Sequence, residues 1–432
     1  MQTIEFKQLD ETLYYKKLDN GLDVYILPKK GFSKTFVTFT TKYGSIDRTF
    51  VPIGETEPIT VPDGIAHFLE HKMFEKEDGD VFQKFSELGA SANAFTSFTR
   101  TAYLFSATDN IYKSTETLLN FVQEPYFTEE TVEKEKGIIG QEITMYDDMP
   151  DWRLYFGTIE NMYDKHPVKI DIAGTIESIS GITAEHLYTC YNTFYHPSNM
   201  LLFAIGNVDP TEMMSFVEQN QNAKTFPEAT EVERLFEPET LEAAIAERSL
   251  NMDVQKPKLY VGVKAKQTDL EGEEMLKHEL AVQIGLEIAF GRASDFFTEI
   301  YEQGLIDESY GFDFSLEQGY GFAMIGSDTN KVEELEQKIK AQLKAMFEGE
   351  AITEAQVETV KRKKIGQFLR ALNSIEFIAN QFTRYKFNDM NLFDVVPTTE
   401  AITRADVMAA LETIRGEKQQ TVFKILPTSE KQ

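Results

Sequence analysis

The chain has 432 residues, of which 42% are hydrophobic and 12% aromatic, so it is long enough to form two or more packed domains. Its formal net charge of −28 repels nucleic acid and anionic membrane surfaces, and we expect neither as a partner. The acidic residues are spread along the chain without a long block. We interpret the charge as a means of staying soluble, and the alternative is an acidic chamber that attracts basic peptides.

The cysteine content and the apolar segments bear on the compartment. Cys190 is the single cysteine, so no internal disulfide can form, which favours a reducing environment. Residues 1–17 carry several charges and lack the apolar run of a signal peptide. The longest apolar stretch, near residues 200–205, is too short to span a bilayer. We therefore expect a cytoplasmic protein.

The first predicted elements are strands over residues 22–27 and 34–41, and a short helix with the sequence HFLEH follows them. His67, Glu70 and His71 stand at positions i, i+3 and i+4, which share one face of a helix. Two imidazoles on that face can hold one divalent ion, and a bound zinc lowers the pKa of its water to about 7. The carboxylate beside it can then take a proton. Idle surface charges are the alternative, but the apolar flanking residues predict a buried helix, where such groups need a partner.

A second helix ends at Gly89 and leads into a strand region over residues 94–106. The small residues at its start, within 91–97, suggest backbone that is exposed for pairing with an extended peptide. Asn93 could bond to the main chain of such a peptide. An ordinary strand with small residues for tight packing explains the pattern equally well.

A long helix predicted over residues 128–148 offers the missing metal ligand. Glu135 and Glu142 lie about two turns apart and face the same way. Glu142 has apolar neighbours, and we assign it as the third ligand, with Glu135 as a carboxylate that orients a ligand imidazole. Solvated helix charges are the alternative for both, and for Glu135 the two readings are nearly even. Two histidines and one carboxylate suit zinc best, although manganese and cobalt accept the same ligands.

The chain contains a diverged internal repeat. A helix, a break and a strand occur near the end of each half, in residues 182–205 and 402–425. The segment 219–242 is rich in Glu, Asn, Ala and Pro and is the predicted linker. We therefore predict an α+β fold with two repeated domains, 1–218 and 243–432, each an antiparallel-rich sheet covered by helices.

The two halves differ in their ability to hold a metal. The repeat places the positions of the histidine motif near Val282, Gly285 and Leu286, where no ligand survives. We therefore expect the ion in the first half alone. The remaining histidines are expected to be structural or exposed to solvent; they are His166, His186, His196 and His278.

These features together resemble the pitrilysin/insulysin metallopeptidases over essentially the whole chain. The likeness rests on the HFLEH motif, the two glutamates of the later helix and the strand sequence NAFTS in a duplicated α+β chain. The length is similar to that of short two-domain members resembling mitochondrial processing peptidase subunits, and the residues around the motif resemble the bacterial YmfH-like group.

The resemblance implies a role for each candidate residue. His67, His71 and Glu142 would be zinc ligands, Glu70 the general base and Glu135 the supporting carboxylate. The candidate substrate-binding residues are Asn93, Ala94, Phe95, Thr96 and Tyr310.

The family also implies an assembly in which two lobes form a clamshell around a closed chamber that admits unfolded peptides. In active members an Arg and a Tyr from a domain without zinc complete the site. Tyr301 stands where that Arg is expected, so we predict a heterodimer with a related subunit that lacks the zinc motif, and otherwise a homodimer. The predicted function is zinc-dependent endopeptidase activity. The alternatives are a non-catalytic peptide-binding or assembly subunit and, with less support, metal-dependent hydrolysis of a non-peptide substrate.

Overall fold

The computed structural model describes residues 1–349 and 351–428, which form two compact units. Neither unit is a continuous segment of the chain. Unit 1 consists of Met1–Ile143, Ile170–Phe236 and Ala371–Phe387, and unit 2 consists of Thr144–Lys169, Glu237–Arg370 and Asn388–Gln432.

Unit 1 is built on a seven-stranded sheet with the order β1-β2-β3-β11-β4-β10-β9. β3 and β11 pair in parallel, and all other neighbours are antiparallel. The central strands β4 and β11 are buried along their whole length, so the core of the unit lies around them. The strands are β1 (Gln2–Phe6), β2 (Glu11–Lys17), β3 (Asp23–Pro28), β4 (Thr35–Thr41), β9 (Ser91–Thr96), β10 (Thr101–Ala107) and β11 (Met200–Gly206), with the short pairs β5 (Thr49–Phe50), β6 (Ile59–Thr60), β7 (Glu75–Lys76) and β8 (Gly79–Asp80).

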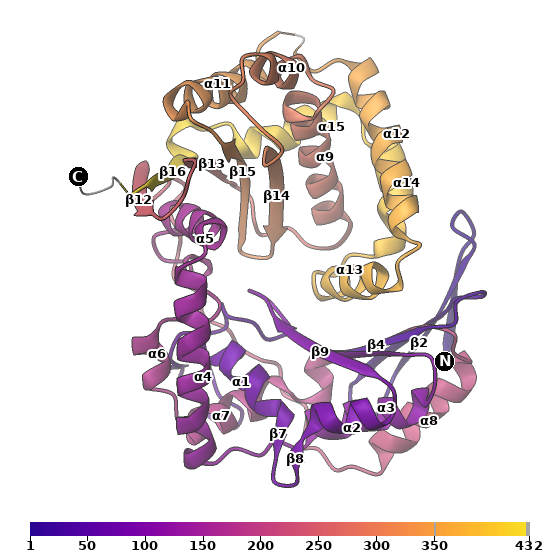
Figure 1. Ribbon diagram of the computed structural model, residues 1–432. Helices are drawn as coiled ribbons and strands as arrows, with labels where there is room; N and C mark the ends of the chain where they lie inside the picture. Colours follow the sequence, from indigo (N-terminus) through magenta and orange to yellow (C-terminus); the bar gives the residue numbers. More distant parts are fainter. Residues whose placement is uncertain (350, 429–432) are drawn as a thin grey trace. The chain divides into compact units, whose positions relative to one another are not determined.

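Helices cover both faces of this sheet. α1, α3 and α8 lie on one face, and α13 lies on the other (Figure 1). On that second face Phe382 of α13 stacks on Phe203 of β11, with ring centroids 4.5 Å apart. The helices of the unit are α1 (Ile65–Phe74), α2 (Val81–Glu87), α3 (Ile111–Gln123), most of α4 (Glu129–Asp147), α6 (Ile176–Ser180), α7 (Ala184–Phe194), α8 (Pro210–Asn222) and α13 (Ile375–Phe387), with the 3₁₀ turn η2 (Pro197–Asn199).

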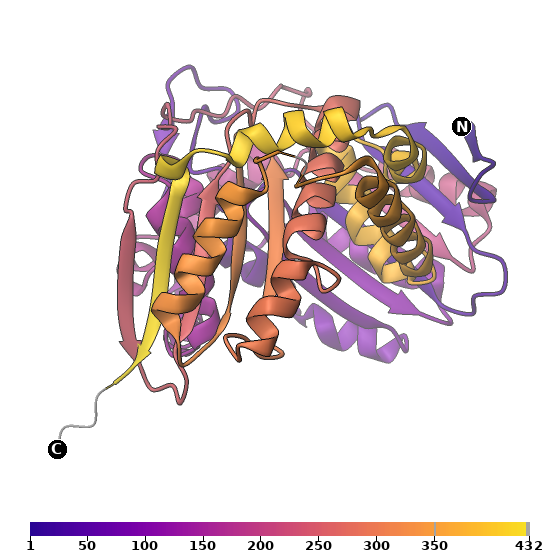
Figure 2. The same cartoon turned by 90° about the horizontal axis from the view of Figure 1, so that it is seen from above.

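Unit 2 has a five-stranded sheet with the order β12-β16-β13-β15-β14. α9 and α11 lie over one face of it (Figure 2). The strands are β12 (Glu247–Met252), β13 (Lys258–Lys264), β14 (Gly311–Glu317), β15 (Tyr320–Asp328) and β16 (Gln420–Pro427). The helices are α5 (Pro150–Met162), α9 (Gly272–Phe290), α10 (Asp295–Glu302), α11 (Val332–Ala345), α12 (Glu354–Ala371), α14 (Val395–Ala401) and α15 (Arg404–Leu411), with the 3₁₀ turns η1 (Pro167–Lys169), η3 (Leu392–Asp394), η4 (Glu412–Ile414) and η5 (Glu417–Gln419).

Each half of the chain contributes one helix to the sheet of the other half. α5 follows α4 and packs on β13 and β16 of unit 2, whereas α13 follows α12 and packs on β4 and β11 of unit 1. Two glycines allow α5 to lie close to its sheet. A Cβ on Gly157 would lie 2.4 Å from the ring of Phe423, and a Cβ on Gly262 would lie 2.6 Å from Thr158. This exchange of helices is the reason that the compact units interleave along the chain.

The predicted fold class is confirmed: the structure is α+β, with two sheets covered by helices. The helix-break-strand pattern reappears as α7-β11 in one half and α15-β16 in the other. The predicted boundaries, 1–218, 219–242 and 243–432, describe continuous halves and remain a prediction for the repeat; α8 continues to Asn222, four residues into the predicted linker.

The segment after α8 is divided between the two units. In unit 1 the guanidinium of Arg234 donates to the buried carboxylate of Asp47, with 2.8 Å between Nε and Oδ1. In unit 2 the carboxylate of Glu239 accepts from Lys264 and from the backbone amides of residues 164–166. Within the described residues, no helix is both long enough and apolar enough to cross a membrane.

Candidate metal centre

The helix α1 holds two histidines and a glutamate in a buried position. It begins after Gly64, whose φ of 86° lies in the left-handed region. A Cβ at this position would lie 2.3 Å from the carbonyl oxygen of Ala173, so glycine alone fits the turn. His67 and Glu70 are each 8% exposed, and the two apolar residues between them are fully buried. The prediction of a buried motif helix is confirmed.

Three side chains of unit 1 converge as a metal ligand set. His67 and His71 come from successive turns of α1, and Glu142 comes from α4. Among the residues that the structure describes, these three are the one group of metal-ligating side chains whose atoms all lie within 4.8 Å of one another. The sequence separates Glu142 from the motif by more than seventy positions, and the packing of α4 beside α1 brings them together (Figure 1).

The distances within this group fit zinc. Oε1 of Glu142 lies 3.7 Å from Nε2 of His67, and Oε2 of the same carboxylate lies 3.5 Å from Nε2 of His71. Two ligand atoms that are each 2.0–2.1 Å from a tetrahedral zinc lie about 3.3 Å apart. The two distances from Glu142 are thus within about 0.4 Å of this separation, and with three protein ligands a fourth position remains for water or substrate.

The protonation states around the group also suit a cation. Burial, with a smaller contribution from His71, lowers the pKa of His67 to about 4, so its ring is neutral near pH 7, as a metal ligand must be. Burial also lowers the pKa of His71, but its hydrogen bond with Glu135 and the nearby carboxylates outweigh this effect and raise the pKa overall. A bound cation would offset the negative charge that these carboxylates bring together.

Glu135 contacts one of the candidate ligands. Its Oε1 lies 3.1 Å from Nδ1 of His71, and its side chain is buried. A histidine that donates its Nδ1 proton to a carboxylate presents Nε2 as the ligand atom, and Nε2 of His71 is the nitrogen nearest to Glu142. This is the arrangement that was predicted for Glu135.

Glu70 is buried beside the ligand set but is not part of it. The hydroxyl of Thr96 donates a hydrogen bond of 2.6 Å to its Oε2. Burial raises the pKa of Glu70, and the hydrogen bond from Thr96 opposes this effect. Sequence analysis placed Thr96 on a substrate strand and gave no sign of this contact, since the two residues are 26 positions apart on different elements.

The remaining predicted strand residues lie on β9, at the edge of the sheet. Within the described residues β9 pairs with β10 alone, which leaves its other side open. The side chain of Asn93 accepts a hydrogen bond from the backbone amide of Ala94, at 2.9 Å. The ring of Phe95 lies 5.6 Å from the guanidinium of Arg100.

Tyr310 is the one predicted site residue that lies in unit 2. It is 7% exposed, and its hydroxyl donates to the carbonyl oxygen of Phe290, at 2.9 Å. Tyr301, by contrast, is 62% exposed on α10. The predicted substrate contact of Tyr310 stays a prediction.

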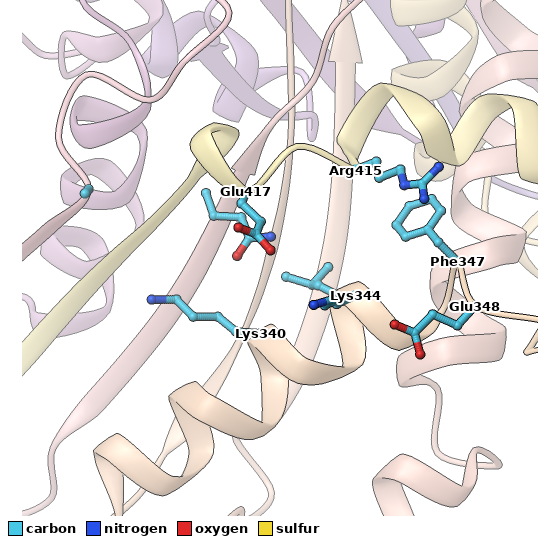
Figure 3. Close-up of a pocket in the computed structure, with 9 residues that line it drawn as sticks. Lys340, Lys344, Phe347, Glu348, Arg415 and Glu417 are labelled. Carbon is cyan, nitrogen blue, oxygen red and sulfur yellow. The ribbon is translucent and has the colours of Figure 1, made fainter.

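Unit 2 contains a cavity of about 560 Å³ whose chemistry differs from that of the metal centre (Figure 3). Its charged lining residues include Lys340 and Arg415, which pair with Glu336 and Glu412 at 2.7 Å each. The guanidinium of Arg415 also lies 5.0 Å above the ring of Phe347. The lining of this cavity thus mixes basic and acidic side chains and has no histidine or cysteine, which distinguishes it from the candidate metal centre.

Comparisons with known proteins agree with this geometry. Residues 50–176 match the family model described as Insulinase (Peptidase family M16), and residues 181–364 match the one described as Peptidase M16 inactive domain. The chain is 58% identical over 429 residues to the uncharacterized zinc protease YmfH of Bacillus subtilis (strain 168), which covers 99% of this chain and 100% of that protein.

Solved structures show the same fold. An M16-like peptidase from Alicyclobacillus acidocaldarius matches with a TM-score of 0.93 and 38% identity, over 97% of this chain and 99% of that one. A protease from Helicobacter pylori matches with a TM-score of 0.82 and 20% identity, over 96% and 99% of the two chains.

The two family models match different parts of the chain, and the candidate metal ligands all lie in the first part. The motif helix and both glutamates of α4 fall within the part that matches the insulinase model. The inactive-domain model covers 181–364, which includes the positions where the repeat has no ligands. From these relatives and this ligand set it follows that the chain belongs to the M16 family of zinc proteases.

Proposed function

We propose that this chain is a zinc-dependent endopeptidase that hydrolyses unfolded peptides, and that it acts as the catalytic subunit of a dimer. The observation that carries the proposal is the convergence of His67, His71 and Glu142 within 4.8 Å, with Glu70 buried beside them. A subunit without catalytic activity would have no need to keep four polar side chains together in a largely apolar helix packing.

Each residue has a distinct role in this proposal. His67, His71 and Glu142 hold the ion, and Glu135 fixes the ring of His71. Zinc held there supplies Lewis acidity, which polarises a scissile carbonyl and lowers the pKa of a water molecule to about 7. Glu70 removes a proton from the attacking water and later delivers it to the leaving amine.

The substrate is proposed to bind as an extended strand along the open edge of β9. A peptide that pairs with this edge gains main-chain hydrogen bonds that do not depend on its sequence. The side-chain carbonyl of Asn93 accepts a hydrogen bond from the backbone amide of Ala94. This hydrogen bond would have to break before that amide could pair with a peptide. Most extended segments of a folded protein are already paired within its own sheets, so unfolded peptides are the expected substrates.

The partner and the compartment are part of the proposal. Because Tyr301 stands at the position expected for an arginine, a related subunit without the zinc motif would supply the missing contacts, and the pair would enclose a chamber. A homodimer is the alternative assembly. A cytoplasmic location agrees with the single buried cysteine, Cys190.

A non-catalytic, peptide-binding subunit is the competing function. The match of residues 181–364 to a model described as an inactive domain favours it, since that part of the chain is not expected to carry out catalysis. The two functions differ in chelator-sensitive cleavage, which the competing function does not predict.

The test uses the purified full chain with its metal content measured, and a mixture of unfolded peptides as substrate. We expect about one zinc per chain and cleavage that stops on chelation and returns when zinc is added. Glu70→Gln is the decisive variant: it should keep the zinc and lower turnover by roughly 10²–10⁴-fold, because it removes the proton acceptor alone. Retention of most activity by Glu70→Gln would refute the role of Glu70.

The dimer is tested separately. Purification of the native complex, followed by identification of the proteins that accompany the chain, should reveal a homologous subunit. Peptide cleavage by the chain alone at the rate of the reconstituted pair would contradict the heterodimer.

A further inference from the structure

Thr96 and Glu70 form a contact that ties the edge strand to the catalytic helix. Thr96 is the last residue of β9, and Glu70 lies on α1. The hydroxyl of Thr96 donates to Oε2 of Glu70 at 2.6 Å. Hydrogen bonds from a hydroxyl to an ionised carboxylate have lengths of about 2.5–2.7 Å, and they are roughly twice as strong as bonds between neutral groups.

The carboxylate of Glu70 depends on this hydroxyl. Glu70 is 8% exposed, so little water reaches it. Among the described residues, Thr96 supplies the one hydrogen bond that the structure gives to its side chain. The terminal torsion of a glutamate has broad preferences and does not fix the carboxylate by itself. The bond from Thr96 holds one oxygen in place and leaves Oε1 available for proton transfer.

We propose that Thr96 is a positioning residue for the peptidase reaction, which holds the carboxylate of Glu70 in the orientation that accepts a proton from water. This inference rests on the proposed function. It also assigns β9 a second task, since the strand that pairs with the peptide carries at its end the hydroxyl that orients the base. Pairing of a peptide along β9 would steady this end of the strand, and the base with it.

The kinetic consequence follows from the position of the contact. The hydroxyl of Thr96 acts on the base, whereas a peptide would pair with the main chain of β9, so loss of the hydroxyl alone should lower kcat and leave KM nearly unchanged. A misplacement of a reacting group by about 1 Å costs up to roughly 10²-fold in rate. We therefore expect Thr96→Val to lower kcat by about tenfold to a hundredfold. Thr96→Ser, which keeps the hydroxyl, should restore kcat to within about threefold of the original protein.

A matched control exists in the same sheet. Thr40 lies on β4, and its hydroxyl is buried without a hydrogen-bond partner among the described residues. Thr40→Val removes a hydroxyl of the same kind without loss of a bond. This variant should keep the kcat, the KM and the zinc content of the original protein, with a melting temperature that is equal or higher, because it removes a buried hydroxyl that has no partner. It separates the effect of the Thr96 contact from that of any Thr→Val exchange.

A second readout does not require activity. Crystal structures of the zinc-loaded protein and of its Thr96→Val variant should show the carboxylate of Glu70 displaced or in two conformers in the variant, with the zinc ligands unchanged. An unchanged carboxylate would overturn the proposal, as would a normal kcat in Thr96→Val or an equal loss in Thr96→Ser. If the original protein lacks peptidase activity, the proposed function fails, while the comparison of the two structures still decides whether Thr96 positions Glu70.

Discussion

The helices α1 and α9 take the same place in the predicted repeat, since each is followed by a shorter helix, α2 or α10, and then by an antiparallel pair of strands, β9-β10 or β14-β15. The residues at the matched positions differ in kind. In unit 1, α1 presents His67, Glu70 and His71 to a metal centre. In unit 2, the positions that correspond to these residues are Val282, Gly285 and Leu286, and all three are buried. One copy keeps polar groups inside the fold, and the other replaces them with apolar packing.

The packing around α9 shows how the second copy is closed. A Cβ on Gly285 would lie 2.6 Å from the side chain of Leu411, so α15 fills the space directly against the helix. In unit 1 the matching space is taken by side chains that are costly to bury without partners. The comparison teaches that the fold does not require the polar cluster: apolar residues make the same element well packed. A bound ion, as proposed, would give a physical reason to retain the cluster in unit 1.

Among the tests of this difference between α1 and α9, a change of the third candidate ligand is expected to have the largest effect. Glu142→Gln replaces a charged candidate ligand by a neutral amide and so removes the negative charge that faces both histidines. Zinc affinity should fall by more than the roughly hundredfold that loss of an outer carboxylate costs, and cleavage should fall with it. Titration calorimetry or a competing chelator measures the affinity.

The same variant tests which unit the metal stabilises. Zinc that binds the folded state alone raises the melting temperature by mass action. The original protein should therefore gain stability on addition of zinc, and Glu142→Gln should not. An equal zinc-dependent gain in the variant would place the ion elsewhere and break the comparison between the two helices.

Each unit also contains a buried histidine with a lowered pKa, and the two histidines have different surroundings. Burial lowers the pKa of both His67 in unit 1 and His166 in unit 2 to about 4. His67 is a candidate ligand, whereas Nδ1 of His166 accepts a hydrogen bond from the amide of Val168, at 3.1 Å. A buried neutral ring is thus not by itself a sign of a metal site. The structural role of His166 should appear as a loss of stability at low pH.

His166 should make the protein less stable in acid. The pKa of His166 in the folded protein, about 4, lies below the ordinary histidine pKa of 6.5, so between these values the unfolded chain binds more protons than the folded one. The contribution of His166 to the free energy of unfolding is therefore fully present above pH 6.5. It decreases by about 3 kcal/mol as the pH falls toward 4. His166→Asn keeps an acceptor for Val168 and cannot titrate. In denaturant titrations of the zinc-free proteins, this variant should lose less stability over that range, and an identical loss in both would contradict the assignment.

The sequence predictions that concern residues on a single helix followed from local patterns. The spacing of His67, Glu70 and His71 places them on one helix whatever surrounds it, and the two-turn separation of Glu135 and Glu142 does the same on α4. These residues are brought together in the structure as the patterns suggested.

Other features could not be read from the sequence because they depend on contacts between distant elements. The bond between Thr96 and Glu70 requires β9 and α1 to lie side by side, and neither residue carries a local sign of it. The exchange of α5 and α13 was missed for a similar reason. An apolar helix face shows that the helix is covered, but it does not identify the sheet that covers it.

Glu135 allows a smaller test of the metal centre. Glu135→Gln leaves all three ligands in place but weakens the carboxylate that orients His71. Zinc affinity should fall by tenfold to a hundredfold, or about 1.4–2.7 kcal/mol. Glu133→Gln is the control, since this side chain on the same helix is exposed and pairs with Lys136. Equal effects of the two variants on zinc affinity would show that the contact between Glu135 and His71 does not support the metal.

The smallest effect is expected for a substitution on α9, where Leu411 fills the space beside Gly285. Gly285→Ala should gain about 1 kcal/mol from higher helix propensity, but the new methyl group would meet Leu411 in a filled core, where overpacking costs about 1–3 kcal/mol. The net result should be a loss of about 1 kcal/mol in the free energy of unfolding, with the zinc content unchanged. Gly366→Ala on α12 is the matched control, because a Cβ there meets nothing within 4 Å and only the gain in propensity of about 1 kcal/mol remains. Denaturant unfolding of both variants measures the difference. If Gly285→Ala stabilises the protein as much as Gly366→Ala, then α15 leaves room against α9, and the closure of unit 2 does not explain why its copy of the helix has no ligands.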